Sequence, residues 1–228
     1  MGIIEVKNLH KVYHDTKVPV KAVNGIDLSF EEGEFSAVVG PSGSGKTTFL
    51  NLIGGLDIPT AGEIRINGEN ISELKSRKLI DFRLQNIGFV FQSFNLIPVL
   101  TAIENVAFIM ELQGKSKNER NKRAKELLNA VGIGDKINNR PGDLSGGQQQ
   151  RVSVARALAS EPKFILADEP TANLDSKSTN DLLDIMQKMN KESKITFIFS
   201  THDQRVMDKA RRIITIDDGK VTSDENRK

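Results

Sequence analysis

One segment of the chain combines glycine, lysine and threonine at the spacing that binds the phosphates of a nucleotide. Gly40-Pro41-Ser42-Gly43-Ser44-Gly45-Lys46-Thr47 matches the pattern G-x-x-x-x-G-K-[ST], between an apolar run, Phe35–Val39, and a helical period that starts at Thr48. Glycines let the backbone curl so that successive N–H groups point at phosphate oxygens, and the helix adds its positive end. We expect Lys46 to reach the β- and γ-phosphates and the Thr47 hydroxyl to bind Mg²⁺. By itself, the motif predicts only a nucleoside triphosphate as ligand.

Two adjacent acids end another apolar run. Asp168 and Glu169 follow Phe164–Ala167 directly. Asp168 is placed to hold Mg²⁺ through water, and Glu169 is the candidate general base that polarises an attacking water. The alternative for Glu169 is a surface acid that caps the next turn. Its position beside Asp168 at a strand end favours the catalytic role.

Three further polar features lie at predicted strand ends or at a helix start. Gln92 ends the run Ile87–Phe91, and His202 follows the run Ile195–Phe199. Leu144-Ser145-Gly146-Gly147-Gln148 precedes a helical stretch and offers a second set of free N–H donors. Ligands of open α/β sheets bind at the ends of strands. Gln92 is suited to coordinate Mg²⁺ or water and to respond to the γ-phosphate.

Short apolar runs position all of these residues. Runs of this kind suit strands that are buried on both faces of a mostly parallel sheet. The expected strands are Ile3–Val6, Phe35–Val39, Glu63–Ile66, Ile87–Phe91, Phe164–Ala167, Ile195–Phe199 and Ile213–Ile216. The expected helices are roughly Lys46–Gly54, Lys117–Val131, Gln148–Ser160 and Ser178–Lys191. The alternation of strands and helices predicts a doubly wound α/β core.

We expect one domain over residues 1–228 with an inserted segment. Residues 93–158 have helical periods and no convincing strand, which predicts a mainly helical subdomain. Residues 1–92 and 159–222 would form the nucleotide-binding α/β core, with a smaller β layer near the N-terminus. Residues 223–228 are polar and charged, and we expect them to be disordered.

Composition excludes several function classes. The 32 Lys+Arg and 30 Asp+Glu residues give a net charge of +2, so no overall field favours nucleic acid or a membrane surface. The absence of cysteine excludes a disulfide framework, a thiolate nucleophile and a Cys-ligated metal site. The sequence predicts neither a membrane span nor a signal peptide. One basic cluster lacks interleaved aromatic residues, so we interpret it as a solvated helix face and expect no nucleic-acid partner. It consists of Lys115, Lys117, Arg120, Lys122, Arg123 and Lys125.

These motifs together resemble those of the ATP-binding subunits of ABC transporters. The resemblance runs from about Ile3 to Gly219, and a Leu-Ser-Gly-Gly-Gln segment in this order is highly specific. The matching residues are Gly40–Thr47, Gln92, Leu144–Gln148, Asp168, Glu169, Asn173-Leu174-Asp175 and His202. The nearest subgroup is the lipoprotein-releasing and macrolide-efflux type, which also includes antimicrobial-peptide export and cell-division relatives. The segments that indicate it are Gly54–Asp57, Phe91–Leu96 and Ala167–Asp175.

The resemblance implies a P-loop NTPase fold with a RecA-like, mostly parallel sheet, an N-terminal antiparallel β layer and an inserted helical subdomain. It implies that Tyr13 stacks on adenine and that His202 holds the γ-phosphate and positions the attacking water. The implied catalytic residues are Glu169, His202 and Gln92; those that bind ATP are Tyr13, Gly40–Thr47, Thr48, Ser145, Gly146, Gly147, Gln148 and Asp175; those that bind Mg²⁺ are Thr47, Gln92 and Asp168.

The resemblance also implies two kinds of partner. In the resembled family, residues such as Ser145, Gly146 and Gly147 close on ATP held by the phosphate loop of another subunit. One copy of each motif in this chain therefore implies a head-to-tail homodimer or a related partner, with Asp175 near the interface. The second partner is a transmembrane permease subunit, which would place the chain peripherally at the cytoplasmic face of the inner membrane.

Other nucleotide-binding classes fit the residues less well. A GTPase should show Asn-Lys-x-Asp, and Asn121-Lys122-Arg123-Ala124 lacks the final acid. A small-molecule kinase would leave Leu144–Gln148 unexplained. ABC ATPases of DNA repair or translation usually carry two cassettes, long insertions or zinc cysteines. An ABC ATPase that regulates a membrane partner in cell division or cell-wall remodelling stays open as an alternative.

The segment after Gln92 is expected to contact the membrane partner. Its apolar run, Phe94–Leu100, lies in a stretch that should be near the surface, and an exposed apolar patch usually marks a partner site. We predict that this run receives a short cytoplasmic helix of the transmembrane subunit. Closure on ATP would then move the helical segment about Gln92.

Overall fold

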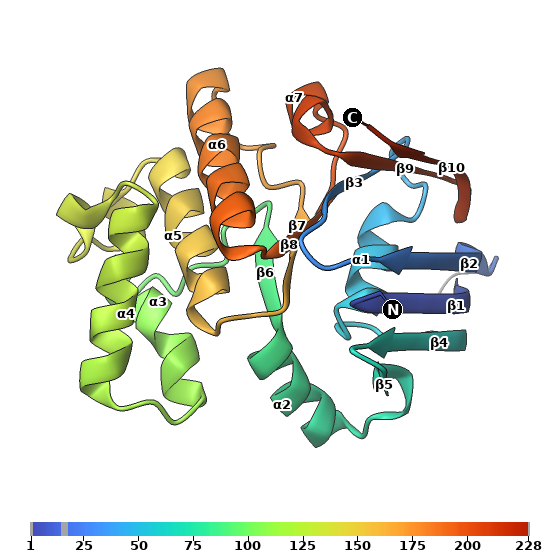
Figure 1. The fold of residues 1–228 in the computed structure, drawn as a ribbon, viewed down its shortest axis with the longest axis horizontal. Helices are drawn as coiled ribbons and strands as arrows, with labels where there is room; N and C mark the ends of the chain where they lie inside the picture. Colours follow the sequence, from blue (N-terminus) through green and yellow to red (C-terminus); the bar gives the residue numbers. More distant parts are fainter. Residues whose placement is uncertain (1, 15–17, 228) are drawn as a thin grey trace.

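The computed structural model describes residues 2–14 and 18–227, which form two sheets with helices between and beside them (Figure 1). The larger sheet has the strand order β10-β9-β3-β8-β7-β6. Its central strands β3 (Phe35–Val39), β7 (Phe164–Asp168) and β8 (Thr196–Ser200) are almost entirely buried. The flanking strands β6 (Ile87–Phe91) and β9 (Arg212–Asp217) pair with them in parallel. The expected mostly parallel core is confirmed, and burial on both faces explains why its apolar runs are continuous.

The smaller sheet is antiparallel and has the strand order β2-β1-β4-β5. Its strands are β1 (Ile4–Tyr13), β2 (Val20–Phe30), β4 (Ala61–Ile66) and β5 (Glu69–Asn70). Helix α1 (Lys46–Ile53) lies between the two sheets and shares one apolar core with both (Figure 1). The buried residues of this core include Ile4, Phe30, Phe49, Leu52, Ile66 and Leu166. The expected N-terminal antiparallel layer is therefore confirmed.

Three helices pack together at the end of the molecule farthest from the smaller sheet (Figure 1). They are α3 (Ala102–Leu112), α4 (Lys117–Ala130) and α5 (Gly146–Ala159). Each begins with a capping box, in which the N-cap and N3 residues bond each other's backbone N–H. Their apolar faces meet in a core that includes Val106, Met110, Leu127, Leu128, Val152 and Leu158. α5 also contacts β6, which ties these helices to the larger sheet.

The remaining α-helices and strand include β10, which, like β2 and β5, is absent from the expected strands. They are α2 (Ser76–Asn86), α6 (Ser176–Ser193), α7 (Gln204–Lys209) and β10 (Lys220–Asn226). The expectation of a disordered tail is wrong for residues 223–226, because β10 pairs antiparallel with β9 through this stretch. The Asp224 carboxylate accepts two bonds of 2.8 Å from the Arg212 guanidinium, which fastens the strand. Lys228 lies outside the described residues.

A buried amide holds the segment between β6 and α3, which has no regular secondary structure. The Asn105 side chain is fully buried, and its Oδ1 accepts the Ile97 N–H at 2.8 Å. Its Nδ2 donates to the carbonyl oxygens of Ile97, Leu100 and Thr101 at 3.2, 3.1 and 3.0 Å. One side chain therefore bonds four backbone groups of this segment, of which the carbonyls of Ile97 and Thr101 also accept a backbone N–H.

Replacing this side chain should destabilise the fold. Asn105→Ala removes the partner of several backbone groups and leaves a cavity, so we expect the free energy of unfolding to fall by about 2–4 kcal/mol. Urea denaturation of the two proteins measures the difference. Asn121→Ala, at an exposed position of α4, is the control and should change it by less than about 0.5 kcal/mol. Equal effects of the two substitutions would contradict the assigned role.

Candidate nucleotide-binding site

Residues from both sheets line one cavity of about 990 Å³. β1 contributes a tyrosine, the loop after β3 contributes residues 40–47 (the phosphate loop), and the ends of β6, β7 and β8 contribute polar side chains. The predicted residues that line the cavity are Tyr13, Gly40, Pro41, Ser42, Gly43, Gly45, Lys46, Thr47, Thr48, Gln92, Glu169 and His202. Ser44 belongs to the same loop but is only 4% exposed and does not line the cavity.

The phosphate loop has a backbone that only glycine allows at three positions. Gly40, Gly43 and Gly45 have φ of 149°, 80° and 103°. A Cβ at Gly40 would lie 2.0 Å from the Ile216 carbonyl oxygen, and one at Gly45 would lie 2.1 Å from that of Ala22. A Cβ at Gly43 would meet no described atom within 4 Å apart from its chain neighbours, so this side of the loop faces open space. Close packing behind the loop and space in front of it suit a cradle for phosphate.

The loop ends at the N-terminus of α1, where charge and oxygen donors converge. No side chain of the described residues caps this terminus, so its N–H groups are available to an anion. The Lys46 ammonium donates to the carbonyl oxygens of Gly40 and Pro41, each at 2.9 Å, and therefore lies inside the curve of the loop. The Thr47 hydroxyl donates to Asp168 Oδ1 at 3.0 Å. The Thr47 hydroxyl and the Asp168 carboxylate are thus adjacent where the loop joins α1.

The acid that follows Asp168 contacts the predicted histidine. Glu169 Oε1 lies 2.8 Å from His202 Nδ1, and its carboxyl group is well shielded while the imidazole is largely exposed. Glu169 has a φ of 46°, which is uncommon for a residue with a side chain. Its N–H donates to the Ser200 carbonyl at 2.8 Å, which helps to hold this conformation. β7 and β8 therefore present an acid and an imidazole as one unit.

A buried glutamine links the ends of β6 and β7. Gln150 of α5 is fully buried, and its Nε2 donates to the carbonyl oxygens of Phe91 at 3.3 Å and Pro170 at 2.7 Å. Asn173 adds a second link, since its Nδ2 donates to the Gln92 carbonyl at 3.0 Å. The Gln92 side chain is exposed and lines the cavity. The loops that carry Gln92 and the acid pair are thus joined to each other and to α5.

The segment Leu144–Gln148 does not line the cavity in the described part of the chain. Ser145 caps α5: its Oγ accepts the Gln148 N–H at 3.3 Å, and Gln148 Oε1 accepts the Ser145 N–H at 2.9 Å. The expectation that these N–H groups are free is wrong at both residues, because the capping box uses them. Gly147 lies against the start of α6, where a Cβ would be 2.9 Å from Ser178 Oγ.

Asp175 caps α6 and lies on the same surface. Its carboxylate accepts the N–H and the O–H of Ser178 at 2.9 and 2.6 Å, and these bonds lower the pKa of Asp175. The structure therefore separates the predicted residues into two groups. One group surrounds the phosphate loop, and the other, Ser145–Gln148 with Asp175, lies beside the first turn of α6.

The sequence analysis missed several residues that line the cavity. They are Pro19, Val20, Lys21, Ala22, Asn24, Ala172, Asp218 and Gly219. The dipeptide Asp218-Gly219 is a recognisable turn signal, and it places Gly219 against the phosphate loop through a 3.0 Å bond to the Ser44 carbonyl. Ala172 lies in the loop after β7, within the segment Ala167–Asp175, and the others come from β2 and the residue before it and carry no motif.

The comparisons with known proteins agree with this geometry. A family model described as ABC transporter matches residues 23–172. An ABC transporter ATP-binding protein of Thermotoga maritima is 46% identical over 225 residues, which cover 99% of this chain and 96% of that protein. The chain belongs to the ABC transporter ATP-binding family. It is an ATP-binding and ATP-hydrolysing cassette of that family.

Two further similarities extend this assignment. The macrolide export ATP-binding/permease protein MacB of Hyphomonas neptunium is 46% identical over 226 residues; these cover 99% of this chain but 35% of that protein. A dimeric structure of the ATP-binding cassette MJ0796 in a post-hydrolysis state, bound to ADP and Pi, matches with a TM-score of 0.92 and 43% identity. Each chain is covered to 99% in that match. The expected ABC ATPase fold is confirmed.

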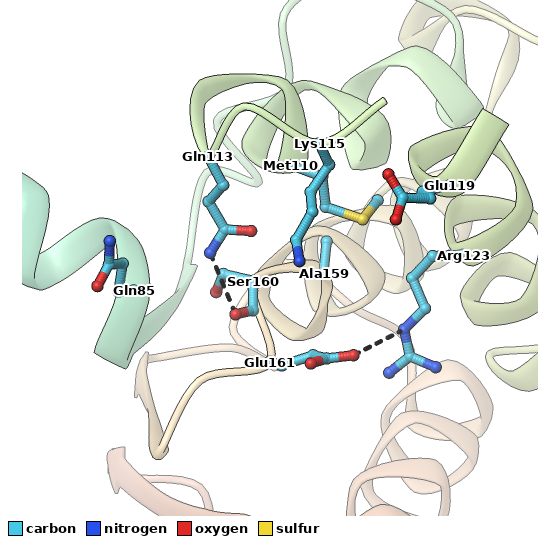
Figure 2. Close-up of a pocket in the computed structure, with 9 residues that line it drawn as sticks. All are labelled: Gln85, Met110, Gln113, Lys115, Glu119, Arg123, Ala159, Ser160 and Glu161. Atoms are coloured by element: carbon cyan, nitrogen blue, oxygen red, sulfur yellow. Dashed lines mark hydrogen bonds and ion pairs between the residues drawn. The ribbon is translucent and has the colours of Figure 1, made fainter. Parts of the chain in front are cut away.

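The ABC cassette has a second, charged cavity of about 430 Å³ beside α3, α4 and α5 (Figure 2). Gln113 projects from the end of α3 and donates to the carbonyl oxygens of Ser160 at 3.2 Å and Leu84 at 3.1 Å. Arg123 Nε, from α4, lies 4.0 Å from Glu161 Oε1 (Figure 2). None of the predicted nucleotide-binding residues lines this cavity.

Within residues 2–14 and 18–227, no helix has both the length and the apolar character needed to cross a membrane.

Asp203 holds the loops around the acid pair together. Its Oδ2 accepts the Thr171 hydroxyl at 2.8 Å, and its carboxylate pairs with the Arg205 guanidinium at 2.7 Å. The bonds from Arg205, with the one from Thr171, lower the pKa of Asp203 to about 2 although burial opposes the change. Thr171 lies just beyond Glu169, and Asp203 directly follows His202.

This lowered pKa predicts a defined loss of stability in acid. Because the folded pKa of about 2 lies below the ordinary 3.8, the ionised Asp203 stabilises the fold above pH 4, and this contribution disappears as the pH falls towards 2. Asp203→Asn should lower the free energy of unfolding at pH 7 by about 2 kcal/mol. Urea midpoints at pH 7, 4 and 2.5 measure it. If the difference in unfolding free energy between the wild type and Asp203→Asn is the same at all three pH values, this explanation is excluded.

Proposed function

We propose that the chain powers export or extraction through a membrane subunit, as the cytoplasmic, peripheral ATPase of a transporter of the lipoprotein-release or efflux type. The observation that carries the proposal is the single cavity in which an aromatic ring, a phosphate loop and an acid–imidazole pair meet. MacB supports the export assignment by its name, which includes a permease. Relatives named as ATP-binding proteins, matched over 96% and 97% of their length, support a permease on a separate chain.

In this proposal the phosphate loop, Lys46 and Thr48 bind the phosphates of ATP, and the Tyr13 ring stacks on adenine. The oxygen donors of Thr47 and Asp168, 3.0 Å apart, are of the type that Mg²⁺ prefers, and the Gln92 amide is a third. Bound Mg²⁺ would neutralise charge on the phosphates. The ammonium of Lys46 then needs only to turn from the loop carbonyls towards the β- and γ-phosphates.

Glu169 is proposed as the general base and His202 as the group that orients it. The 2.8 Å contact with the imidazole holds Glu169 Oε1. Oε2 accepts only a long bond of 3.4 Å from the Thr201 hydroxyl and keeps a lone pair that can accept a proton from water. The bond between the Glu169 N–H and the Ser200 carbonyl keeps the carboxylate at the strand end. His202 is exposed and faces the cavity, so it can also reach the γ-phosphate.

A second copy of the chain is proposed to complete each site. Ser145–Gln148 and Asp175 lie on one surface, outside the cavity that holds the phosphate loop. A head-to-tail dimer would bring that surface of one chain over the phosphate loop of the other. The ATP-binding cassette MJ0796, 44% identical to this chain, has been solved as a dimer, which supports the arrangement.

A substitution of the base should separate chemistry from binding. Glu169→Gln keeps the shape and polarity of the side chain but removes its basicity, so ATP turnover should fall by roughly 10²–10⁴-fold. ATP affinity should persist, and a dimer should accumulate with ATP and Mg²⁺ because the nucleotide is no longer consumed. Phosphate release and light scattering measure the two effects. Glu161→Gln, at an exposed site, is the control. A variant that stays monomeric with bound ATP would contradict the dimer.

The proposed surface for the membrane subunit is an apolar groove of about 460 Å³ between α2, β6 and α3. Ile80 of α2 is 54% exposed and Leu56 is 43% exposed at its edge. The run 94–100, which we expected near the surface, contributes to this groove only in part. Leu96 packs against the core and Ile97 lines the groove, whereas Val99 is 71% exposed.

The charges of the groove indicate the chemistry of its occupant. Among the described residues that line it, the charged side chains are Arg83 and Arg156, and no carboxylate accompanies them. The Arg156 guanidinium donates to the carbonyl oxygens of Phe94 and Asn95, and burial lowers its pKa. We therefore propose that an apolar helix with an acidic residue docks here. Arg156 would pass its movement to the segment that follows Gln92.

A charge placed in the groove should uncouple the ATPase from the membrane. Ile80→Glu should leave ATP affinity unchanged, because the groove is separate from the nucleotide cavity, but should abolish association with the membrane subunit. The fraction of ATPase that sediments with membranes measures this. Leu112→Glu is the matched control, since Leu112 is 55% exposed on α3 but does not line the groove. If Ile80→Glu still sediments with membranes and supports transport, the docking surface lies elsewhere.

A further inference from the structure

A carboxylate and an ammonium hold the Tyr13 ring. The Tyr13 hydroxyl donates to Asp57 Oδ2 at 2.7 Å, and the Lys11 ammonium donates to Asp57 Oδ1 at 2.6 Å. The Lys11 ammonium also lies 4.8 Å from the centre of the Tyr13 ring. Both charged groups are largely shielded, with 13% of the Lys11 and 27% of the Asp57 side chain exposed. The three side chains therefore form a compact, mutually bonded unit.

Only one member of this unit lines the nucleotide cavity. Tyr13 is part of the cavity wall, whereas neither Lys11 nor Asp57 is among the described residues that line it. The Lys11 ammonium lies over one face of the Tyr13 ring, a contact that attracts a cation to an aromatic ring. The contacts from Lys11 and Asp57 thus support the ring from outside the cavity.

Asp57 belongs to the turn that ends the phosphate-binding helix. The N–H groups of Leu56 and Asp57 donate to the Asn51 carbonyl in α1, at 2.8 and 3.2 Å. α1 begins with Lys46 and Thr47. The Tyr13 hydroxyl is therefore bonded to the same helix and turn that carry the phosphate loop at their other end.

The turn is also fastened to β1 next to Tyr13. The Thr60 Oγ1 accepts the Val12 N–H at 2.9 Å, and the Thr60 N–H donates to the His10 carbonyl at 2.8 Å. The Lys11 ammonium donates to the Ile58 carbonyl at 2.8 Å. These bonds place Asp57 under the ring without help from Tyr13, so the carboxylate can position the ring rather than follow it.

We propose that Asp57, together with Lys11, is a positioning residue that fixes the Tyr13 ring at a set distance and angle from the phosphate loop. The inference rests on the proposed stacking of Tyr13 on adenine. A side chain that is already ordered loses less conformational freedom when the base binds, so its affinity for the base is higher. Burial raises the pKa of Asp57, but the bonds from Lys11 and Tyr13 together outweigh this effect and the pKa is lowered. The carboxylate therefore stays ionised at neutral pH.

The test compares a ligand that has a base with one that has none. ATP uses both the ring and the phosphate loop, whereas inorganic tripolyphosphate uses only the loop. Asp57→Ala should raise the Kd of ATP about 10-fold, near the lower end of what losing a bond to a charged group costs. The Kd of tripolyphosphate should change less than about twofold. Calorimetric titration of the full chain measures both.

Two conservative variants and a control sharpen the result. Tyr13→Phe keeps the ring but removes its hydroxyl, so Asp57→Ala should have little further effect in that background. Asp57→Asn should lie between the wild type and Asp57→Ala, because an amide oxygen still accepts from the phenol but cannot pair with Lys11. Glu63→Ala breaks another ion pair of the same sheet, with Arg65, and should change neither Kd.

The chain carries its own optical reporter of this contact. Tyr13 is the single tyrosine and there is no tryptophan, so tyrosine emission arises from one ring. A hydrogen-bonded carboxylate quenches phenol fluorescence, and Asp57→Ala should therefore increase the emission of the protein without nucleotide. A merely structural ion pair would not produce this change together with an ATP-specific loss of affinity.

The remaining outcomes distinguish a failure of the positioning role of Asp57 from a failure of the proposed stacking of Tyr13 on adenine. If Tyr13→Ala weakens ATP but Asp57→Ala does not, the ring stacks on the base and Asp57 does not position it. If Tyr13→Ala leaves the Kd of ATP unchanged, the proposed stacking itself is wrong. If Asp57→Ala weakens ATP and tripolyphosphate equally, Asp57 supports α1 as a whole and the inference is overturned.

Discussion

The close approach of the phosphate loop to its neighbours is the constraint on which the rest of the site depends. At Gly40 and Gly45 the loop backbone lies so near the carbonyl oxygens of Ile216 and Ala22 that even one methyl group would not fit. This contact fixes the loop against both sheets. Because the loop leads directly into α1, it also fixes the helix axis and the turn that follows it. The positions of the base, the phosphates and the acid pair are then set relative to one rigid support.

The parallel sheet brings together the polar side chains that lie opposite the phosphate loop in the site. Parallel strands end at the same edge, so the residues that follow β6, β7 and β8 are brought within reach of the loop after β3. The side chains at these ends are not independent of one another. Asp203 joins the loops beyond Glu169 and His202, and Asn173 joins the acid loop to Gln92. The chemistry is therefore held by bonds between loops, while the strands determine only which loops meet.

The sequence predicted the sheet and the phosphate loop well because both have short, local signals. Continuous apolar runs mark buried strands, and the glycine spacing marks the loop. Helix α2 was missed because its apolar signal is weak: Leu79 and Phe82 pack against the core, but none of its residues is fully buried. Strand β10 was missed because Asp224 looks like a tail residue until Arg212 is seen beside it. The role of Asp57 was equally hidden, since it depends on a contact with a tyrosine 44 positions earlier in the chain.

Gln150 has a consequence for how the molecule can move. Its amide nitrogen bridges the carbonyl groups of Phe91 and Pro170, and its Oε1 has no hydrogen-bond partner among the described residues. The same helix carries Ser145 at its first turn. The loops beyond β6 and β7 therefore cannot shift separately from α5 without breaking bonds to a buried amide, and such bonds are costly to lose. Such a connection leaves few intermediate positions and favours a small number of discrete arrangements. The two ends of α5 would then change together, which makes its response to a ligand abrupt rather than graded.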